Sequence, residues 1–354
     1  MTEQTLEWFD EQVEICQVDT VPYTLPPSYG RGSFNFYNAT YRNENGDEEG
    51  CFVEKETLCS IFDTDNDPSL ADSILRRSKR EVGILRSLSK NNPHVYQCID
   101  IVRTQQSVHR IYEEQLPCYS IHHRFANSAS SFTQNAEALR YIMNQLFTVL
   151  DDCHSQSIVH GQIQPRSMLV IPKNNNSDSK EITFHLKLTN FDRARTFYET
   201  DPFEYNHHKC FSTLWFAAPE ILLSEPESRD ALEGSETDVW AAGVTFAHLA
   251  VNNTPLFPGD SEFSTLLKIF RQLGTPNANL WPEASQLPYY NAEFPKWNAI
   301  PFPKDIRNKL REEGCHLLQK MLSLNPSQRP TVKECMRHAY FRGLAVKKNT
   351  LDSS

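Results

Sequence analysis

The chain has 354 residues, of which 39% are hydrophobic and 23% charged, and its formal net charge is −10. This length suits a two-lobed domain with short extensions at both ends. The acidic balance argues against nucleic-acid binding, which needs an excess of Lys and Arg against phosphate.

The predicted elements begin with a sheet. Residues 1–22 read as a polar, acidic extension without the apolar core of a secretory signal, so we expect a cytoplasmic or nuclear location. Aromatic alternation after Tyr29 predicts a strand pair that turns at Asn45-Gly46. The stretch 51–58 continues this sheet.

One helix and two further strands should complete this first unit. The apolar residues Ile74, Val82, Leu85 and Leu88 recur at helical spacing and predict a helix over 70–88. Strands are expected near 96–102 and 108–114.

Helices dominate the rest of the chain. The repeat of apolar residues over 136–154 predicts an amphipathic helix, and a strand pair is expected at 169–171 and 182–188. Further helices are predicted from Ser235, from Ser261, and over 305–324. The stretch 239–251 is too short for a membrane span and predicts a buried helix.

Nine cysteines without a C-x-x-C pair indicate reduced thiols rather than a disulfide framework or a zinc site. The nearest approach to a metal cluster is His207-His208-Lys209-Cys210. No second ligand pair lies at finger or helical spacing, so a solvated loop is preferred and no metal site is expected.

Several ordered motifs carry a family resemblance. They are PLFPGDSE at 255–262, FRQLGTP at 270–276, FPKW at 294–297, TLWFAAPE at 213–220 and DVW at 238–240. On these motifs the span 24–341 resembles the eukaryotic protein kinases, and within them the cyclin-dependent kinases.

The resemblance implies an α+β, bilobal protein-kinase fold. A small antiparallel sheet with one major helix would form the N-lobe, 23–115, and a larger, mainly helical C-lobe would cover 116–341. Residues 342–354 would then form a flexible tail.

The resemblance also implies five residues with structural roles. Glu220 and Arg329 should form a buried ion pair, and Asp238 should accept hydrogen bonds from the catalytic-loop backbone. His160 should pack beneath Phe191, and this core role is preferred over proton transfer. The stack that joins the lobes would include Leu85 and Cys98.

The residues that would perform the chemistry are replaced. Against H-R-D-L-x-x-x-N and D-F-G, Gln162 stands for the proton-accepting Asp, and Ser167 and Asn190 stand for the two metal ligands. Gln164 replaces the Lys that would neutralise developing charge. Asp192, at the Gly of D-F-G, is the alternative, as a shifted metal ligand.

The nucleotide site that the resemblance implies is degenerate. Its matching residues are Gly30, Gly32, Lys55, Glu81, Tyr112, Glu113 and Leu169. Lys55 and Glu81 match a retained ion pair, for which a structural role is preferred over phosphate binding. Tyr37, Val53 and Tyr112 add bulk to the adenine slot. We therefore expect no certain cofactor and at most weak binding of Mg·ATP.

Regulatory positions differ as well. Gly161 replaces the Arg that would bind an activating phosphate, and His208 aligns with the activating Thr. The cyclin-facing helix is unusually basic at Arg76-Arg77-Ser78-Lys79-Arg80, which indicates a solvated face, with a groove for a partner as the alternative.

These observations predict a cyclin-dependent-kinase-like pseudokinase that acts by protein binding, as a scaffold, decoy or allosteric regulator. Its partner would be a cyclin, a kinase or a substrate. No nucleic acid or membrane partner is expected, and the chain alone should be monomeric. The alternatives are a weak or unconventional ATP-dependent Ser/Thr kinase and a nucleotide-binding switch without phosphotransfer.

Overall fold

The fold was analysed in a computed structural model. The structure describes residues 16–17, 34–42, 48–57, 68–89, 92–103, 107–113, 119–121, 136–172, 184–197, 214–251 and 254–344.

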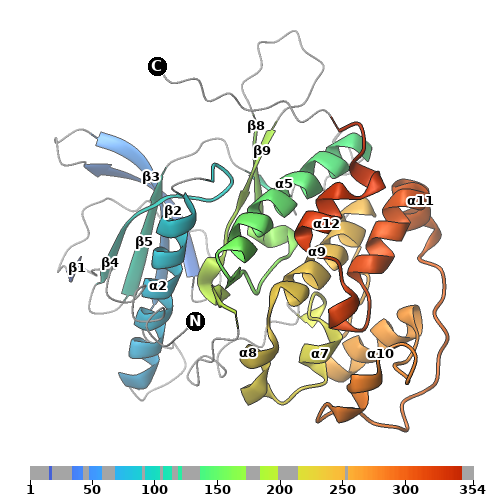
Figure 1. The fold of residues 1–354 in the computed structure, drawn as a ribbon. Helices are drawn as coiled ribbons and strands as arrows, with labels where there is room; N and C mark the ends of the chain where they lie inside the picture. The colour runs from blue at the N-terminus through green and yellow to red at the C-terminus, as the bar shows by residue number, and fades with distance from the viewer. Residues whose placement is uncertain are drawn as a thin grey trace.

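A five-stranded sheet forms the first part of the molecule, on the left of Figure 1. Its spatial order is β1-β4-β5-β3-β2, and all neighbours are antiparallel except β1 and β4. The strands are β1 (Cys16–Gln17), β2 (Phe34–Arg42), β3 (Glu48–Thr57), β4 (Cys98–Arg103) and β5 (Ser107–Glu113).

The long helix α2 (Pro68–Ser89) lies against this sheet. It contacts β4 and β5 and buries Ile74, Val82, Leu85 and Leu88, the residues whose spacing predicted it. The hairpin of β2 and β3 is confirmed, but its expected turn at Asn45-Gly46 lies outside the described residues. Cys16 and Gln17, within the expected extension, pair with β4 and so belong to the sheet.

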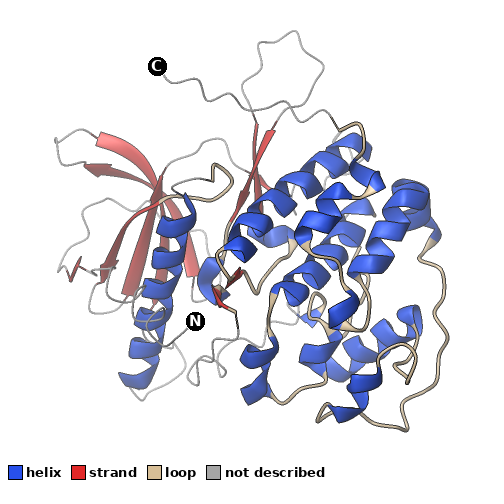
Figure 2. Ribbon diagram, viewed as in Figure 1, coloured by secondary structure: helices blue, strands red, loops and turns tan. Residues whose placement is uncertain are grey.

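The second part of the molecule is mainly helical (Figure 2). Its principal helices are α5 (Ala136–Ser155), α9 (Ser235–Ala250), α10 (Glu262–Leu273) and α11 (Lys304–Met321). Shorter helices are α7 (Pro219–Leu222), α8 (Arg229–Leu232) and α12 (Val332–Arg337). The 3₁₀ turns are η1 (Pro165–Ser167), η2 (Phe191–Arg193), η3 (Pro226–Ser228), η4 (Pro282–Gln286), η5 (Pro326–Gln328) and η6 (Ala339–Phe341).

One predicted helix differs from the structure. The expected continuous helix 305–324 ends at Met321 and is interrupted at Arg311, whose φ of 59° and ψ of −166° are not helical. The apolar residues on both sides of the break, among them Leu310 and Leu318, are buried all the same. Tertiary packing therefore maintains the buried face across a local break that periodicity did not reveal.

Two small β-units lie at the start of the helical part. Strand β8 (Met168–Pro172) lies between β6 (Tyr119–Ser120) and β9 (Phe184–Leu188), which confirms the predicted pair at 169–171 and 182–188. The two-residue strands β7 (Ile158–Val159) and β10 (Arg195–Thr196) pair antiparallel. The catalytic loop predicted from the sequence runs from β7 to β8.

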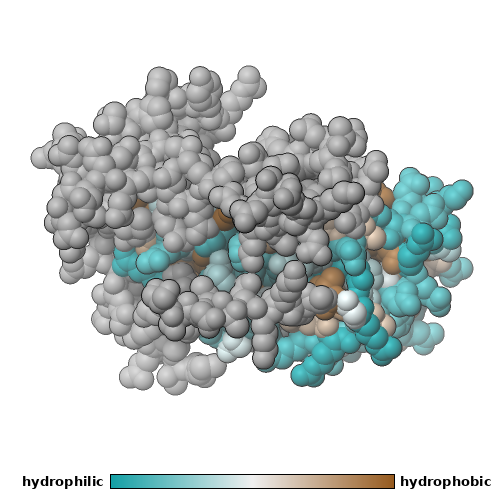
Figure 3. Space-filling model, turned by 90° about the horizontal axis from the view of Figure 1, so that it is seen from above, coloured by the Kyte–Doolittle hydropathy of each residue, from teal (hydrophilic) through white to brown (hydrophobic). Residues whose placement is uncertain are grey.

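Helix α9 forms the centre of the helical part. Residues 237–250 of this helix are all buried, which confirms the predicted buried helix, and α9 contacts both α5 and α11. Within the described ranges, no helix has the length and apolar character needed to cross a membrane. In the view of Figure 3, the described surface of the helical part is mostly hydrophilic.

Candidate functional site

The loop between β7 and β8 is held by one buried carboxylate. Asp238 accepts hydrogen bonds from the backbone N–H groups of His160, at 2.8 Å, and Gly161, at 3.0 Å. The Nε2 atom of His154 lies 3.0 Å from the same carboxylate. Burial raises the pKa of Asp238, but the hydrogen bond and charge of His154, with smaller contributions from His160, outweigh it and lower the pKa overall. Asp238 therefore stays ionised and fixes the loop backbone.

His160 lies within the core. Its Nε2 donates to the carbonyl oxygen of Thr189 at 3.0 Å, and its Nδ1 accepts from the backbone N–H of Gln162 at 3.2 Å. The centroids of the His160 and Phe191 rings are 4.6 Å apart in a T-shaped arrangement. Burial lowers the pKa of His160. Because both ring nitrogens form hydrogen bonds with backbone groups, one as donor and one as acceptor, the geometry is that of a neutral, packed imidazole.

Ser167 has its hydroxyl engaged within the loop itself. Its Oγ donates to the carbonyl oxygen of Gln164 at 2.8 Å and accepts from the Gln164 N–H at 3.1 Å. The side chain is completely buried. With one bond donated and one accepted, the hydroxyl keeps a single neutral lone pair, a weaker cation ligand than a carboxylate. Ser167 thus stabilises the bend that leads into η1.

Gln162 occupies the position expected for the proton acceptor. Its Oε1 is shielded from solvent and accepts no hydrogen bond from the part of the chain that the structure describes. A neutral amide oxygen accepts a hydrogen bond but does not take up the proton at neutral pH. The position therefore lacks the group that general base catalysis requires.

The second loop begins with Asn190, whose φ of 63° and ψ of 56° place it in the left-handed region. Asn adopts this conformation more readily than most residues with a side chain. It precedes η2, which holds the buried Phe191 and the half-buried Asp192. The backbone of this loop is thus compatible with Asn, while its side chain contributes no negative charge.

The carboxylate of Glu81, on α2, has a cation partner that the sequence did not suggest. Nε of the buried Arg110, on β5, lies 3.3 Å from Glu81 Oε2, and Arg110 Nη1 donates to Ser78 Oγ at 2.7 Å. The backbone register pairs Arg110 with Glu54 and His109 with Lys55. The expected partner, Lys55, has a side chain outside the described residues.

The other nucleotide-site positions are described in part. Tyr112 is buried on β5, with its ring edge-on to Tyr96 at 6.3 Å, and Leu169 is half-buried on β8. Glu113 is placed only as a strand position. Gly30 and Gly32, like His207-His208-Lys209-Cys210, lie outside the described residues.

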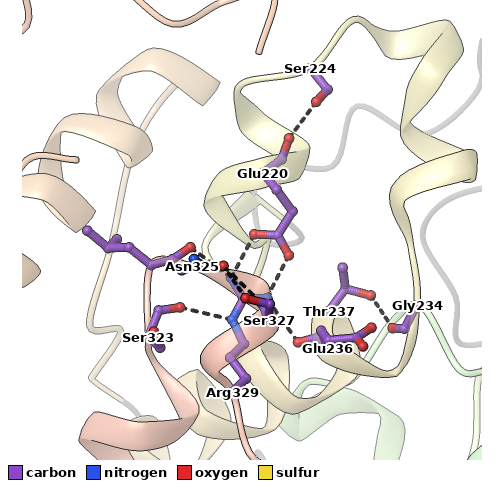
Figure 4. A network of polar contacts seen from close by, with 10 residues as sticks. Glu220, Ser224, Gly234, Glu236, Thr237, Ser323, Asn325, Ser327 and Arg329 are labelled. Carbon is purple, nitrogen blue, oxygen red and sulfur yellow. Dashed lines mark hydrogen bonds and ion pairs between the residues drawn. The ribbon is translucent and has the colours of Figure 1, made fainter. Parts of the chain in front are cut away.

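The base of the helical part contains a buried ion pair (Figure 4). Arg329 donates to the two carboxylate oxygens of Glu220, with Nη1–Oε1 at 2.6 Å and Nη2–Oε2 at 2.7 Å. Arg329 also donates to the Glu236 and Ser323 carbonyl oxygens, each at 3.0 Å. Its guanidinium carbon lies 4.9 Å from the centroid of the Trp240 ring. This network joins α7, α9 and the segment around η5.

The arrangement of a sheet-and-helix part and a helical part agrees with a comparison to known families. The family model described as protein kinase domain matches residues 57–341. The chain belongs to the protein kinase family. The match includes the loops around Gln162 and Asn190 and begins two residues after Lys55.

The donor set of this kinase domain does not suit Mg²⁺. Hard divalent cations prefer carboxylate oxygens, whereas Asn190 is neutral and Ser167 bonds to its own loop. Among the described residues, no group of three or more His, Cys, Asp and Glu side chains is placed to hold a metal ion. Cys98, Cys153, Cys315 and Cys335 form no disulfide.

Sequence reasoning missed three residues of the kinase domain that take part in buried ion pairs: Arg110, Glu233 and its partner Arg195. Arg110 lies in a predicted strand beside the apolar residues Val108 and Ile111, which was a signal that a buried acid should face it. Glu233 lies beside the catalytic loop but follows a four-residue helix with no motif. Only the tertiary structure brings Glu233 to its partners.

Proposed function

We propose that this member of the protein kinase family is a cyclin-dependent-kinase-like pseudokinase that acts by binding another protein. One observation carries the proposal. The Ser167 hydroxyl, at one metal-ligand position, is bonded to the Gln164 backbone. The residues at the proton-acceptor position, Gln162, and at the second metal-ligand position, Asn190, are both neutral.

The physical reason is the charge that phosphoryl transfer creates. Metal ions must neutralise the phosphates, and a carboxylate must accept the proton of the attacking hydroxyl. Loss of the general base alone typically costs about 10²- to 10⁴-fold in rate. Loss of the anionic metal ligand at Asn190, together with the replacement of the amide ligand by Ser167, removes electrostatic stabilisation as well.

The buried residues that remain maintain the fold around this site. Asp238 holds the catalytic loop, and Glu220 and Arg329 join the helices beneath it. The segment 255–297, which contains three of the motifs that carry the resemblance, is also held by a hydrogen bond, since Trp215 Nε1 donates to the Gly259 carbonyl at 2.7 Å. A maintained fold around a site with neutral residues at the catalytic positions favours a binding role over catalysis.

The partner class follows from the resemblance to cyclin-dependent kinases. We propose a cyclin, a kinase or a substrate as the partner, with the chain acting as a scaffold, decoy or allosteric regulator in the cytoplasm or nucleus. A pull-down from native extract, with a variant whose surface residues are scrambled as the control, tests this. Recovery of nothing above the control contradicts the proposal.

The enzymatic alternative rests on Asp192. Its Oδ1 is shielded from solvent two residues beyond Asn190, which places a carboxylate near the position of the missing ligand. A radiolabelled-ATP assay with generic substrates distinguishes the two functions. We expect no incorporation above that of Lys55→Met, and incorporation lost in both Lys55→Met and Asp192→Asn supports the enzyme instead.

The remaining alternative is a nucleotide switch without transfer. A ligand that binds only the folded state raises stability by RT ln(1 + [L]/Kd), so a thermal-shift titration with ATP, with and without Mg²⁺, reports binding directly. We expect no Mg²⁺-dependent shift. A saturable shift without incorporation of phosphate favours the switch.

A further inference from the structure

A buried ion cluster lies beside the catalytic loop. Arg195 Nη2 donates to Oε2 of Glu233, and Arg193 Nη2 lies 3.8 Å from Oε1 of the same carboxylate. The exposed fractions of the side chains are 1% for Arg195, 8% for Glu233 and 28% for Arg193. One carboxylate therefore stands between two guanidinium groups, and the cluster can be reached from solvent on the side of Arg193.

The cluster connects segments that are 38 residues apart. Arg193 closes η2, and Arg195 lies in β10 opposite Val159 of β7. Glu233 follows α8, and its backbone N–H is bonded to the Arg229 carbonyl at 3.0 Å, two residues before α9 begins at Ser235. The strand that leaves the Asn190 loop is thereby tied to the segment that joins α8 to α9.

Gly161 provides the space for this carboxylate. Its φ is +72°, a conformation that residues with a side chain seldom adopt. A Cβ atom there would lie 3.4 Å from Glu233 Oε2 and 3.1 Å from the Arg193 carbonyl oxygen. The position expected to hold an Arg is thus a glycine against which Glu233 lies.

From this geometry we propose that Arg193 and Arg195 form an oxyanion-binding site and that Glu233 is its built-in ligand. Planar guanidinium groups bind carboxylate and phosphate through the same charge-assisted hydrogen bonds. Because the site is filled by the chain's own side chain, the segment 191–197 is anchored without any covalent modification. Removal of the Glu233 side chain leaves a vacated site that accepts a small oxyanion.

The test is chemical rescue of Glu233→Ala by inorganic phosphate. Removing the carboxylate leaves Arg195 buried without that counter-charge, so the melting temperature should fall by several degrees. Millimolar phosphate should then raise the melting temperature of Glu233→Ala clearly more than that of the wild type, at matched ionic strength in chloride. Glu225→Ala, at an exposed glutamate of the preceding turn, should show neither effect.

A second variant identifies the site. In Arg195→Met combined with Glu233→Ala, the phosphate effect should disappear. Equal phosphate effects on the wild type and Glu233→Ala, or an effect that survives in the double variant, overturn the proposal. If Glu233→Ala does not fold in chloride, it is refolded in phosphate. Recovery in phosphate alone supports the site, and no recovery in either salt contradicts it.

Discussion

Glu220 and Arg329, which are 109 residues apart in the sequence, form a two-pronged ion pair whose side chains are almost fully buried. Removing one partner of such a pair leaves an uncompensated charge in the interior. Arg329→Met should therefore lower the free energy of unfolding by about 3–5 kcal/mol, measured by urea denaturation.

The control for this prediction is an exposed pair. Lys333 Nζ lies 3.8 Å from Asp151 Oδ1, and the two side chains are 60% and 29% exposed. Lys333→Met should cost about 0–1 kcal/mol, because solvent screens this pair. Similar losses in the two variants would show that the burial of the Glu220–Arg329 pair does not set its contribution.

Ser167→Ala should destabilise the protein although the residue has no catalytic role in our proposal. The substitution leaves the buried N–H of Gln164 without its hydroxyl partner, which costs about 1–3 kcal/mol. Urea denaturation measures the loss. In Ser285→Ala, only an exposed hydroxyl bond to Pro282 is lost, and stability should change little. An unchanged Ser167→Ala protein would contradict the structural role.

Arg110, rather than Lys55, should be the main energetic partner of Glu81. Double-mutant cycles with Arg110→Met and Glu81→Gln, and with Lys55→Met and Glu81→Gln, separate the two interactions. We expect a coupling energy of about 1 kcal/mol or more for Arg110, because this pair is buried and Arg110 also bonds to Ser78. A larger coupling energy between Lys55 and Glu81 would support the pair predicted from the sequence instead.

The His316–His338 pair predicts a pH dependence of stability. His316 Nδ1 lies 2.9 Å from His338 Nε2, and His338 Nδ1 accepts from the Tyr340 N–H, so protonating His338 at Nδ1 breaks the bond to Tyr340. Burial lowers the pKa of His338, helped by the positive charges of His316, Lys320 and Arg342 and opposed by Glu313. The folded state therefore binds fewer protons than the unfolded state.

The contribution of neutral His338 to the free energy of unfolding is fully present above the pKa of an unfolded His, about 6.5. It is lost as the pH falls through the lower pKa that His338 has in the folded state. His338→Asn keeps an acceptor for the Tyr340 N–H but does not titrate. Urea denaturation on both sides of pH 6.5 should show a smaller acid loss in His338→Asn than in the wild type. An equal loss of unfolding free energy on acidification in the two proteins would exclude His338 as a source of the pH dependence.

Local periodicity predicted most of the fold. The spacing in α2 and α5 and the apolar run of α9 are short-range features, so the sequence alone located these elements. The break at Arg311 was not predicted, because the apolar pattern continues through it.

The sequence by itself determined which residues stand at the catalytic positions, since the identity of Gln162, Ser167 and Asn190 needs no coordinates. Only the tertiary structure decided where the remaining charges pair. Arg110 reaches Ser78 across 32 residues, and Glu233 reaches Arg195 across 38. Such partners are selected by packing between distant segments, because a buried charge must meet whichever opposite charge the fold brings within bonding distance.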